Sequence, residues 1–174
     1  MEISDSWTLS TAPNYKVNVN GAVFSHIQGS GVGVVICDHE GRVVVAMRKK
    51  LLQPLGPLEI KVKAMEIGAS FAWDTSIRDV VVESDSKIVA DTLLRLCTPS
   101  MVVSNILVGI AYKLQDFRPV QVSHVKCQGN KLAHLLAKFA KEIDNIDNYV
   151  TWIEVNPSLI ELAITHDLLN LSSS

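Results

Sequence analysis

The stretch YKVNVNGAVFSHIQGSGVGVVICDHEGRVVVAM, residues 15–47, decides the fold of this chain. At its start, Tyr15, Val17 and Val19 alternate with a lysine and two asparagines. Successive side chains of a strand point to opposite faces. This period of two therefore predicts a strand over residues 15–24.

Two further strands complete this stretch. Residues 28–31 read QGSG and predict a turn, and the β-branched run over 32–37 predicts a largely buried strand. Residues 38–41 read DHEG, a polar connection that ends in glycine and suits a hairpin. A third strand is predicted over 42–47, so the three strands form an antiparallel meander.

A change of period after Pro54 and Pro57 predicts a helix over residues 58–73. At about 100° per residue, one arc carries the apolar and small residues Leu58, Val62, Met65, Gly68, Ala69 and Ala72. This stripe is suited to lying close against a sheet. Lys61 falls in the middle of the same arc, where a lysine is unexpected.

The later elements complete an α/β domain. The patterns predict a strand over 80–82, helices over 84–96 and 103–117, a strand over 120–125, and a helix from 129 to about 140. This order predicts a five-stranded mixed sheet, in which crossovers add the last strands to the meander and helices flank the sheet. We expect a loose leader over 1–14, the domain over 15–144, and a C-terminal extension over 145–174 that contains a helix.

Composition narrows the class of protein. With 174 residues, 48% of them hydrophobic and 20% charged, the chain can build one globular core. A formal net charge of -2 means that nucleic-acid binding would need a local basic patch, for which Arg48, Lys49, Lys50, Lys126, Lys131 and Lys138 are candidates. The three cysteines form no CxxC pair, and we find no secretory signal or membrane-spanning stretch. We expect an intracellular protein, cytoplasmic or nuclear, with no membrane partner.

Five local sequences carry a resemblance to a known family: KVNVNGA at 16–22, GVGVVICD with EGR at 31–42, VVVESDS at 80–86, VSHV at 122–125, and 129–138. Over about residues 15–142 the chain resembles the ribonuclease H-like superfamily. More narrowly, it is similar to the plant domain of the ribonuclease H type 1 and reverse-transcriptase-associated class, which is related to retroelements.

The resemblance implies four site positions. Family members that cleave RNA in RNA–DNA hybrids hold two Mg²⁺ or Mn²⁺ ions with four carboxylates, since hard cations prefer oxygen ligands. Position by position, the four acids fall on Asn20, Lys61, Asp85 and His134, of which only Asp85 is still a carboxylate. With Lys61 at +1 and Asp85 at -1, the site charge changes from about -4 to about 0. We therefore expect metal binding to be weak or absent.

Alternatives remain open at two positions. Glu59 or Glu66 supplies the helix carboxylate if the helix has another register, although both lie on its polar side. Asp85 is either an inherited metal ligand or a helix cap. Lys61 either extends its ammonium to solvent or turns inward and pairs with Asp85.

Three functions are consistent with this pattern. The first is a nucleic-acid-binding domain, for an RNA–DNA hybrid or a related duplex, that has lost or weakened two-metal hydrolysis. The second is an active RNA–DNA hybrid endoribonuclease that uses Asp85 with a substitute carboxylate. The third is a protein-interaction module that docks through the apolar segment 157–171.

Overall fold

The computed structural model describes residues 15–77, 79–84, 120–124, 131–144, 148–153 and 160. The leader expected over 1–14, the helix expected over 103–117, and Asp85 itself lie outside the described residues. So does the helix expected over 84–96, apart from Ser84, which is the last residue of a strand rather than the start of a helix. So does the segment 157–171 apart from Ile160. Among the described residues, no helix is long and apolar enough to cross a membrane.

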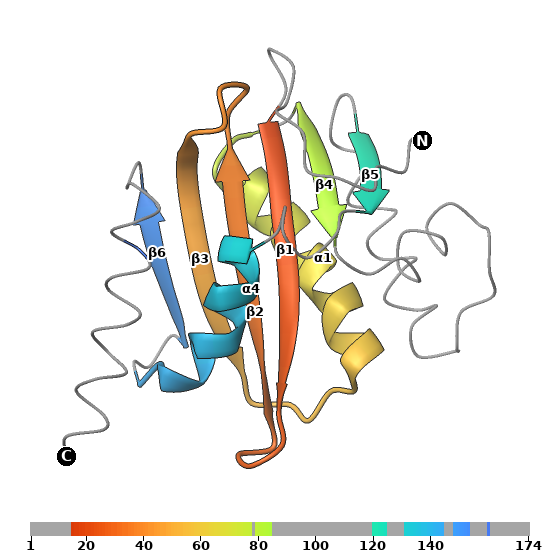
Figure 1. Ribbon diagram of the computed structural model, residues 1–174, viewed down its shortest axis with the longest axis vertical. Helices are drawn as coiled ribbons and strands as arrows, with labels where there is room; N and C mark the ends of the chain where they lie inside the picture. The colour runs from red at the N-terminus through yellow and green to blue at the C-terminus, as the bar shows by residue number, and fades with distance from the viewer. Residues whose placement is uncertain are drawn as a thin grey trace.

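The described strands form one mixed sheet in the order β5-β4-β1-β2-β3-β6 (Figure 1). The strands are β1 Tyr15–Phe24, β2 Gly29–Cys37, β3 Val43–Leu51, β4 Val80–Ser84, β5 Val120–His124 and β6 Tyr149–Ile153. The first three pair antiparallel, and β4 and β5 run parallel to β1. The predicted mixed sheet is confirmed for its five strands.

The sixth strand was not predicted from the sequence. β6 pairs antiparallel with β3, and its residues Trp152 and Val150 pack on the same side as the residues that follow the last helix. Ile160, still further along the chain, is fully buried in the same cluster as Trp152. The C-terminal extension therefore contributes both an edge strand and a core side chain to the domain.

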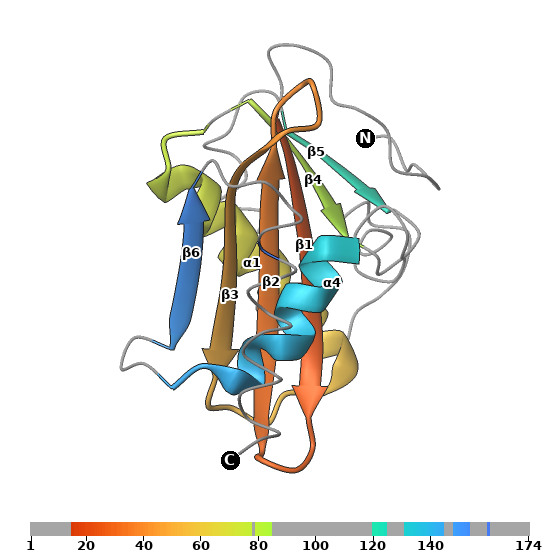
Figure 2. The ribbon, with the colours of Figure 1, turned by 60° about the vertical axis from the view of Figure 1, so that its left-hand side comes forward.

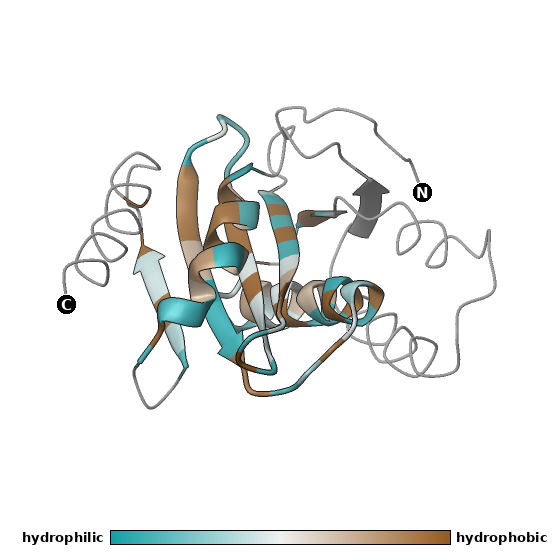
Figure 3. Cartoon of the chain, turned by 60° about the horizontal axis from the view of Figure 1, so that its bottom comes forward, coloured by the Kyte–Doolittle hydropathy of each residue, from teal (hydrophilic) through white to brown (hydrophobic). Residues whose placement is uncertain are grey.

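Helices cover both faces of the sheet (Figures 1 and 2). α1, Pro57–Asp74, buries Met65, Ala69 and Ala72 against Val17 and Val19 of β1. On the other face lies α4, Lys131–Lys138, which continues as the 3₁₀ turn η2, Phe139–Glu142. Each turn of this helix carries both hydrophilic and hydrophobic residues, as expected where only one side touches the sheet (Figure 3).

The turn predicted over residues 28–31 was placed too late. The turn spans 25–28 and ends at Gln28 in a left-handed conformation (φ 48°), and β2 already begins at Gly29. The glycines serve close packing instead, because a Cβ on Gly31 would overlap the carbonyl oxygen of Ala137, and one on Gly33 that of Ala133. Glycine inside a strand commonly marks such a close backbone approach.

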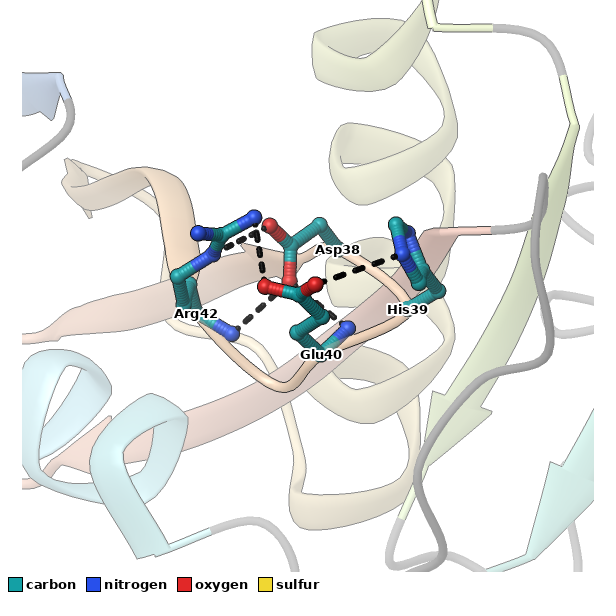
Figure 4. Close-up of polar contacts among 4 residues, drawn as sticks. All are labelled: Asp38, His39, Glu40 and Arg42. Carbon is teal, nitrogen blue, oxygen red and sulfur yellow. Dashed lines mark hydrogen bonds and ion pairs between the residues drawn. The ribbon is translucent and has the colours of Figure 1, made fainter.

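The hairpin predicted over 38–41 is confirmed and is held by Asp38 (Figure 4). One oxygen of this carboxylate accepts hydrogen bonds from the backbone N–H groups of Glu40 and Arg42, and the other accepts from Arg42 Nε, all at 2.9 Å. Loss of solvent raises the pKa of Asp38, but these hydrogen bonds outweigh it and lower the pKa below its ordinary value.

Candidate functional site

The site begins where β1 passes closest to α1. β1 turns Lys16, Asn18 and Asn20 away from the α1 side of the sheet, and all three are buried. At Gly21 a Cβ would lie 2.8 Å from Ile60 Cγ1 and 2.9 Å from the Ile60 carbonyl oxygen. Only glycine fits so close to α1. This approach sets the next helical residue, Lys61, beside Asn20.

A chain of hydrogen bonds joins three of the predicted positions. Oδ1 of Asn20 accepts from Lys61 Nζ at 3.2 Å and from the backbone N–H of Gly21 at 2.8 Å. The amide nitrogen of Asn20 lies 3.3 Å from Nδ1 of His134 on α4. One strand and two helices from opposite faces of the sheet thus contribute to a single polar cluster.

The donors fix the orientation of the Asn20 amide. A lysine ammonium and a backbone N–H can only donate, so the atom between them must be the amide oxygen. The amide nitrogen then faces His134 and donates, and Nδ1 of the neutral imidazole accepts. This arrangement uses the neutrality of Asn20, since a carboxylate offers no donor toward His134.

The fourth predicted position, Asp85, lies outside the described residues. Ser84, which precedes Asp85 in the sequence, pairs with Val19, which precedes Asn20. The end of β4 and the Asn20 position of β1 therefore occupy neighbouring places in the sheet.

The two substitute carboxylates are engaged elsewhere. Glu59 accepts a hydrogen bond from the backbone N–H of Gly56 at 2.9 Å, which caps the first turn of α1. Glu66 pairs with Lys63 at 2.7 Å, and both line a hollow between α1 and strands β3 and β6. Neither contact involves Asn20.

The described residues do not fit a two-metal centre. Oδ1 of Asn20 already accepts two hydrogen bonds, and the Lys61 ammonium repels a divalent cation. His134 contributes a nitrogen, which suits zinc or copper better than magnesium. No group of three or more His, Cys, Asp or Glu side chains gathers as a metal site within the described ranges.

A buried ion pair beside this cluster was missed by the sequence reasoning. Lys16 Nζ lies 3.0 Å from Glu83 Oε1, and the two side chains are 4% and 2% exposed. Along β1, Asn18 lies between Lys16 and Asn20. Its Oδ1 is buried and has no hydrogen-bond partner among the described residues. Burial raises the pKa of the nearby Cys37 thiol to about 11; Asp38 and Glu83 add to this effect, and Lys16 opposes it.

Of the predicted basic candidates, two are used inside the fold. Arg48 is 4% exposed, donates to the Phe139 carbonyl at 3.3 Å and lies over the Trp152 ring. Lys50 donates to the carbonyl of Ile143 at 3.4 Å. These two cations therefore tie β3 to η2 rather than form an external patch. Lys126 lies outside the described residues.

Comparison with known proteins identifies the family. The model of the reverse transcriptase-like family matches residues 18–140. The chain belongs to this family. No curated protein matches the sequence. β6 begins beyond the end of the family match, so it is an addition to the part that this reverse transcriptase-like chain shares with its family.

Solved structures confirm the ribonuclease H-like fold of this family member. An RNase H1 from the halophilic archaeon Halobacterium salinarum NRC-1 matches with a TM-score of 0.70 and 19% identity, over 74% of this chain and 98% of that one. The N-terminal RNase H domain of Rv2228c from Mycobacterium tuberculosis, a fusion with maltose-binding protein, gives 0.64 and 16%, over 72% and 91%. LC11-RNase H1, isolated from compost by a metagenomic approach, gives 0.55 and 17% in its complex with an RNA/DNA hybrid, over 71% and 94%.

Proposed function

We propose that this domain binds RNA–DNA hybrid or a related duplex and does not carry out two-metal hydrolysis. The observation that supports the second part is the chain of hydrogen bonds from Lys61 through Asn20 to His134. Three of the four positions that would hold metal in the family are joined to one another instead.

The proposal that the domain binds a duplex is supported by its family membership and by one solved structure with the same fold. The chain belongs to the reverse transcriptase-like family, and LC11-RNase H1, which has the same fold, is known in complex with an RNA/DNA hybrid. A duplex is recognised largely through its backbone and shape, and this recognition does not require the metal ions that cleave it. Binding can therefore outlast the loss of the carboxylates.

The charge of the cluster supports the loss of hydrolysis. Two-metal cleavage depends on negative ligands that hold two cations close together against their mutual repulsion. Asn20 is neutral, His134 is neutral or positive, and Lys61 is positive. With Asp85 included, the four positions sum to about 0 when His134 is neutral, so the cluster lacks the negative charge that would hold two divalent cations.

A cleavage assay tests the hydrolysis part. Purified protein is incubated with end-labelled RNA–DNA hybrid in Mg²⁺ and in Mn²⁺, beside an Asp85→Ala control. We expect no product above the control in either metal. Metal-dependent cleavage that Asp85→Ala abolishes would overturn the proposal and favour the active-nuclease alternative.

A binding assay tests the first part separately. We expect salt-dependent binding of the labelled hybrid in EDTA, measured by fluorescence anisotropy, because phosphate contacts release counterions. If the hybrid does not bind at any salt concentration, the binding proposal fails and the protein-interaction alternative gains. Ile160 of the segment 157–171 is buried within the domain, so a docking surface there would have to use other residues.

A further inference from the structure

The outer side of α4 and η2 carries a row of basic side chains, one of which, His134, belongs to the Asn20 cluster. Lys131, His134, Lys138 and Lys141 are spaced by three, four and three residues, and all four are exposed. Residues separated by three or four positions lie on the same side of a helix. We call these four residues the α4 basic row. Residues 131–141 contain no acid.

The lysines of this row are not engaged by the part of the fold that the structure describes. Within the described ranges, Lys131, Lys138 and Lys141 form no ion pair, and Lys138 lies over the ring of Phe139, 5.6 Å from its centroid. Most other described cations are engaged: Lys16 with Glu83, Arg42 with Asp38, Arg48 and Lys50 with backbone carbonyls, Lys61 with Asn20, and Lys63 with Glu66. Among the described residues, the cations without such a contact are the lysines of the α4 basic row and Lys49, which lies on the other face of the sheet.

The row connects two distinct places on the surface. At one end, His134 contacts the Asn20 amide. At the other end, Lys138 and Lys141 line a hollow of about 410 Å³ together with residues 22–27, which form the end of β1 and the start of the β1–β2 turn and include His26. Glu142 also lines this hollow and is the one acid there.

We propose that the α4 basic row binds consecutive phosphates of one strand of the nucleic acid, and leads that strand from the Asn20 cluster to the hollow at the β1–β2 turn. This inference rests on the proposed function and adds the route that the backbone takes. A helix rises about 1.5 Å per residue, so the row from Lys131 to Lys141 is about 15 Å long. Measured along the axis of a DNA duplex, that length corresponds to roughly four nucleotides of one strand at about 3.4 Å each.

The chemistry of the row suits a phosphodiester backbone. Lysine ammonium groups bind phosphate as point charges and read no base sequence. The overall formal charge is -2, so attraction of a polyanion depends on a local patch of this kind. A helix side with lysines is often only solvated, but here the three lysines form no ion pair with any described residue, the row contains no acid, and His134 links it to Asn20.

Two charge-matched variants test the route. Lys138→Gln/Lys141→Gln removes two charges from the row, and Lys49→Gln/Lys63→Gln removes two from the opposite side, where both lysines line the hollow between α1, β3 and β6. Removing two positive charges takes the formal net charge from -2 to -4 in either variant. Lys138→Arg/Lys141→Arg keeps the charge of the row. Thermal unfolding checks that all three variants are folded.

The measurement is anisotropy of a labelled RNA–DNA hybrid in EDTA, from about 50 to about 200 mM salt. We expect the row variant to weaken binding on the order of tenfold and to flatten the slope of log K against log salt by about 1.8, which is the loss of two phosphate contacts. The opposite-side variant and the arginine variant should stay near the parent protein.

Each other result is informative. If the parent protein binds and both glutamine variants weaken it equally, the route is wrong while the proposed function stands. If the parent protein does not bind the hybrid, the proposed function fails and the route fails with it. If it binds vesicles containing phosphatidylserine but no hybrid, the row is a lipid-binding surface and this inference is overturned.

Discussion

The ammonium nitrogen of Lys61 lies 3.2 Å from Oδ1 of Asn20 and joins the first helix to the first strand. The resemblance to family members that cleave hybrids implies carboxylates at these two positions, where metal ions would offset their mutual repulsion. Here the cation belongs to the protein itself. The lysine thus removes the repulsion that the metal would otherwise have to offset.

If carboxylates are restored at positions 20, 61 and 134, we expect the stability of the protein to depend on bound metal. The triple variant Asn20→Asp/Lys61→Glu/His134→Asp should have a lower Tm than the parent protein in EDTA, because three carboxylates would repel one another at contacting positions. Mn²⁺ should then raise the Tm of the triple variant by about 5–10 °C at about 100 times its Kd. Thermal unfolding with and without the metal measures both effects.

The parent protein and a quadruple variant are the controls for this experiment. Adding Asp85→Asn to the triple variant should remove part of the Mn²⁺ effect if Asp85 is a ligand. An equal Mn²⁺ effect on the parent protein would contradict the argument, because it would show that the present side chains already hold the metal.

The sequence located these three side chains but not the bonds between them. Asn20, Lys61 and His134 follow from fixed places in a family pattern, and the wheel position of Lys61 agreed with that pattern. The hydrogen bonds depend on how close Gly21 allows α1 to come, and on which end of the Asn20 amide faces Lys61. Both are set by tertiary packing, which a single sequence does not reveal.

For the buried pair Lys16–Glu83, a single substitution should lower the unfolding free energy much more than replacement of both residues. Glu83→Gln removes a carboxylate 3.0 Å from a buried ammonium and should cost about 3–5 kcal/mol of unfolding free energy. The apolar double variant Lys16→Met/Glu83→Leu should recover most of this loss, because it removes both buried charges together. Urea unfolding of the two variants and the parent protein provides the comparison.

If the double variant is as unstable as Glu83→Gln, the pair matters for more than its charge balance. No pattern in the sequence indicates this contact. Lys16 pairs with Val81 in the sheet register, so the ion pair reaches Glu83 diagonally, as long side chains can between neighbouring strands.

Substitution of Gly33 should destabilise the fold and also disturb the site, because Gly33 packs against the helix that carries His134. A Cβ at this position would overlap the carbonyl oxygen of Ala133 and lie 2.7 Å from the backbone nitrogen of Ala137. Gly33→Ala must therefore displace α4, at a cost of about 3 kcal/mol. His134 is the next residue on that helix, so its contact with Asn20 should be lost as well.

Gly56→Ala is the matched control, because a Cβ there meets nothing closer than 3.4 Å. It should cost no more than about 1 kcal/mol. Urea unfolding measures the cost, and the NMR signals of the His134 ring report its contact. A Gly33→Ala protein with unchanged stability would show that α4 packs less closely than described.

The glycines of β2 show why the strands and the helix could be predicted while the position of the turn before β2 could not. Alternation and helical period are local properties, so the three strands and the helix of residues 15–77 could be predicted from sequence. Gly29 and Gly31 signal a turn just as strongly as they signal close packing. The choice between these two depends on α4, which follows about a hundred residues later.

We expect the contribution of Asp38 to the stability of the β2–β3 hairpin to depend on pH. The pKa of this carboxyl is lowered in the folded state, so its ionised form stabilises the fold at pH values above the ordinary value near 4. That contribution is lost as the pH falls through the lowered pKa of the folded state. Asp38→Asn should therefore lower the Tm at pH 7 by a few degrees, and the difference from the parent protein should shrink in acid.

Asp74→Asn removes one exposed carboxylate at the end of α1 and controls for the change in net charge. The Tm of all three proteins is measured between neutral and acid pH. A difference between Asp38→Asn and the parent protein that stays constant over this range would mean that the carboxylate acts only as a neutral acceptor. A difference that disappears in acid means that the negative charge, facing the N–H groups of Glu40 and Arg42, is what closes the hairpin.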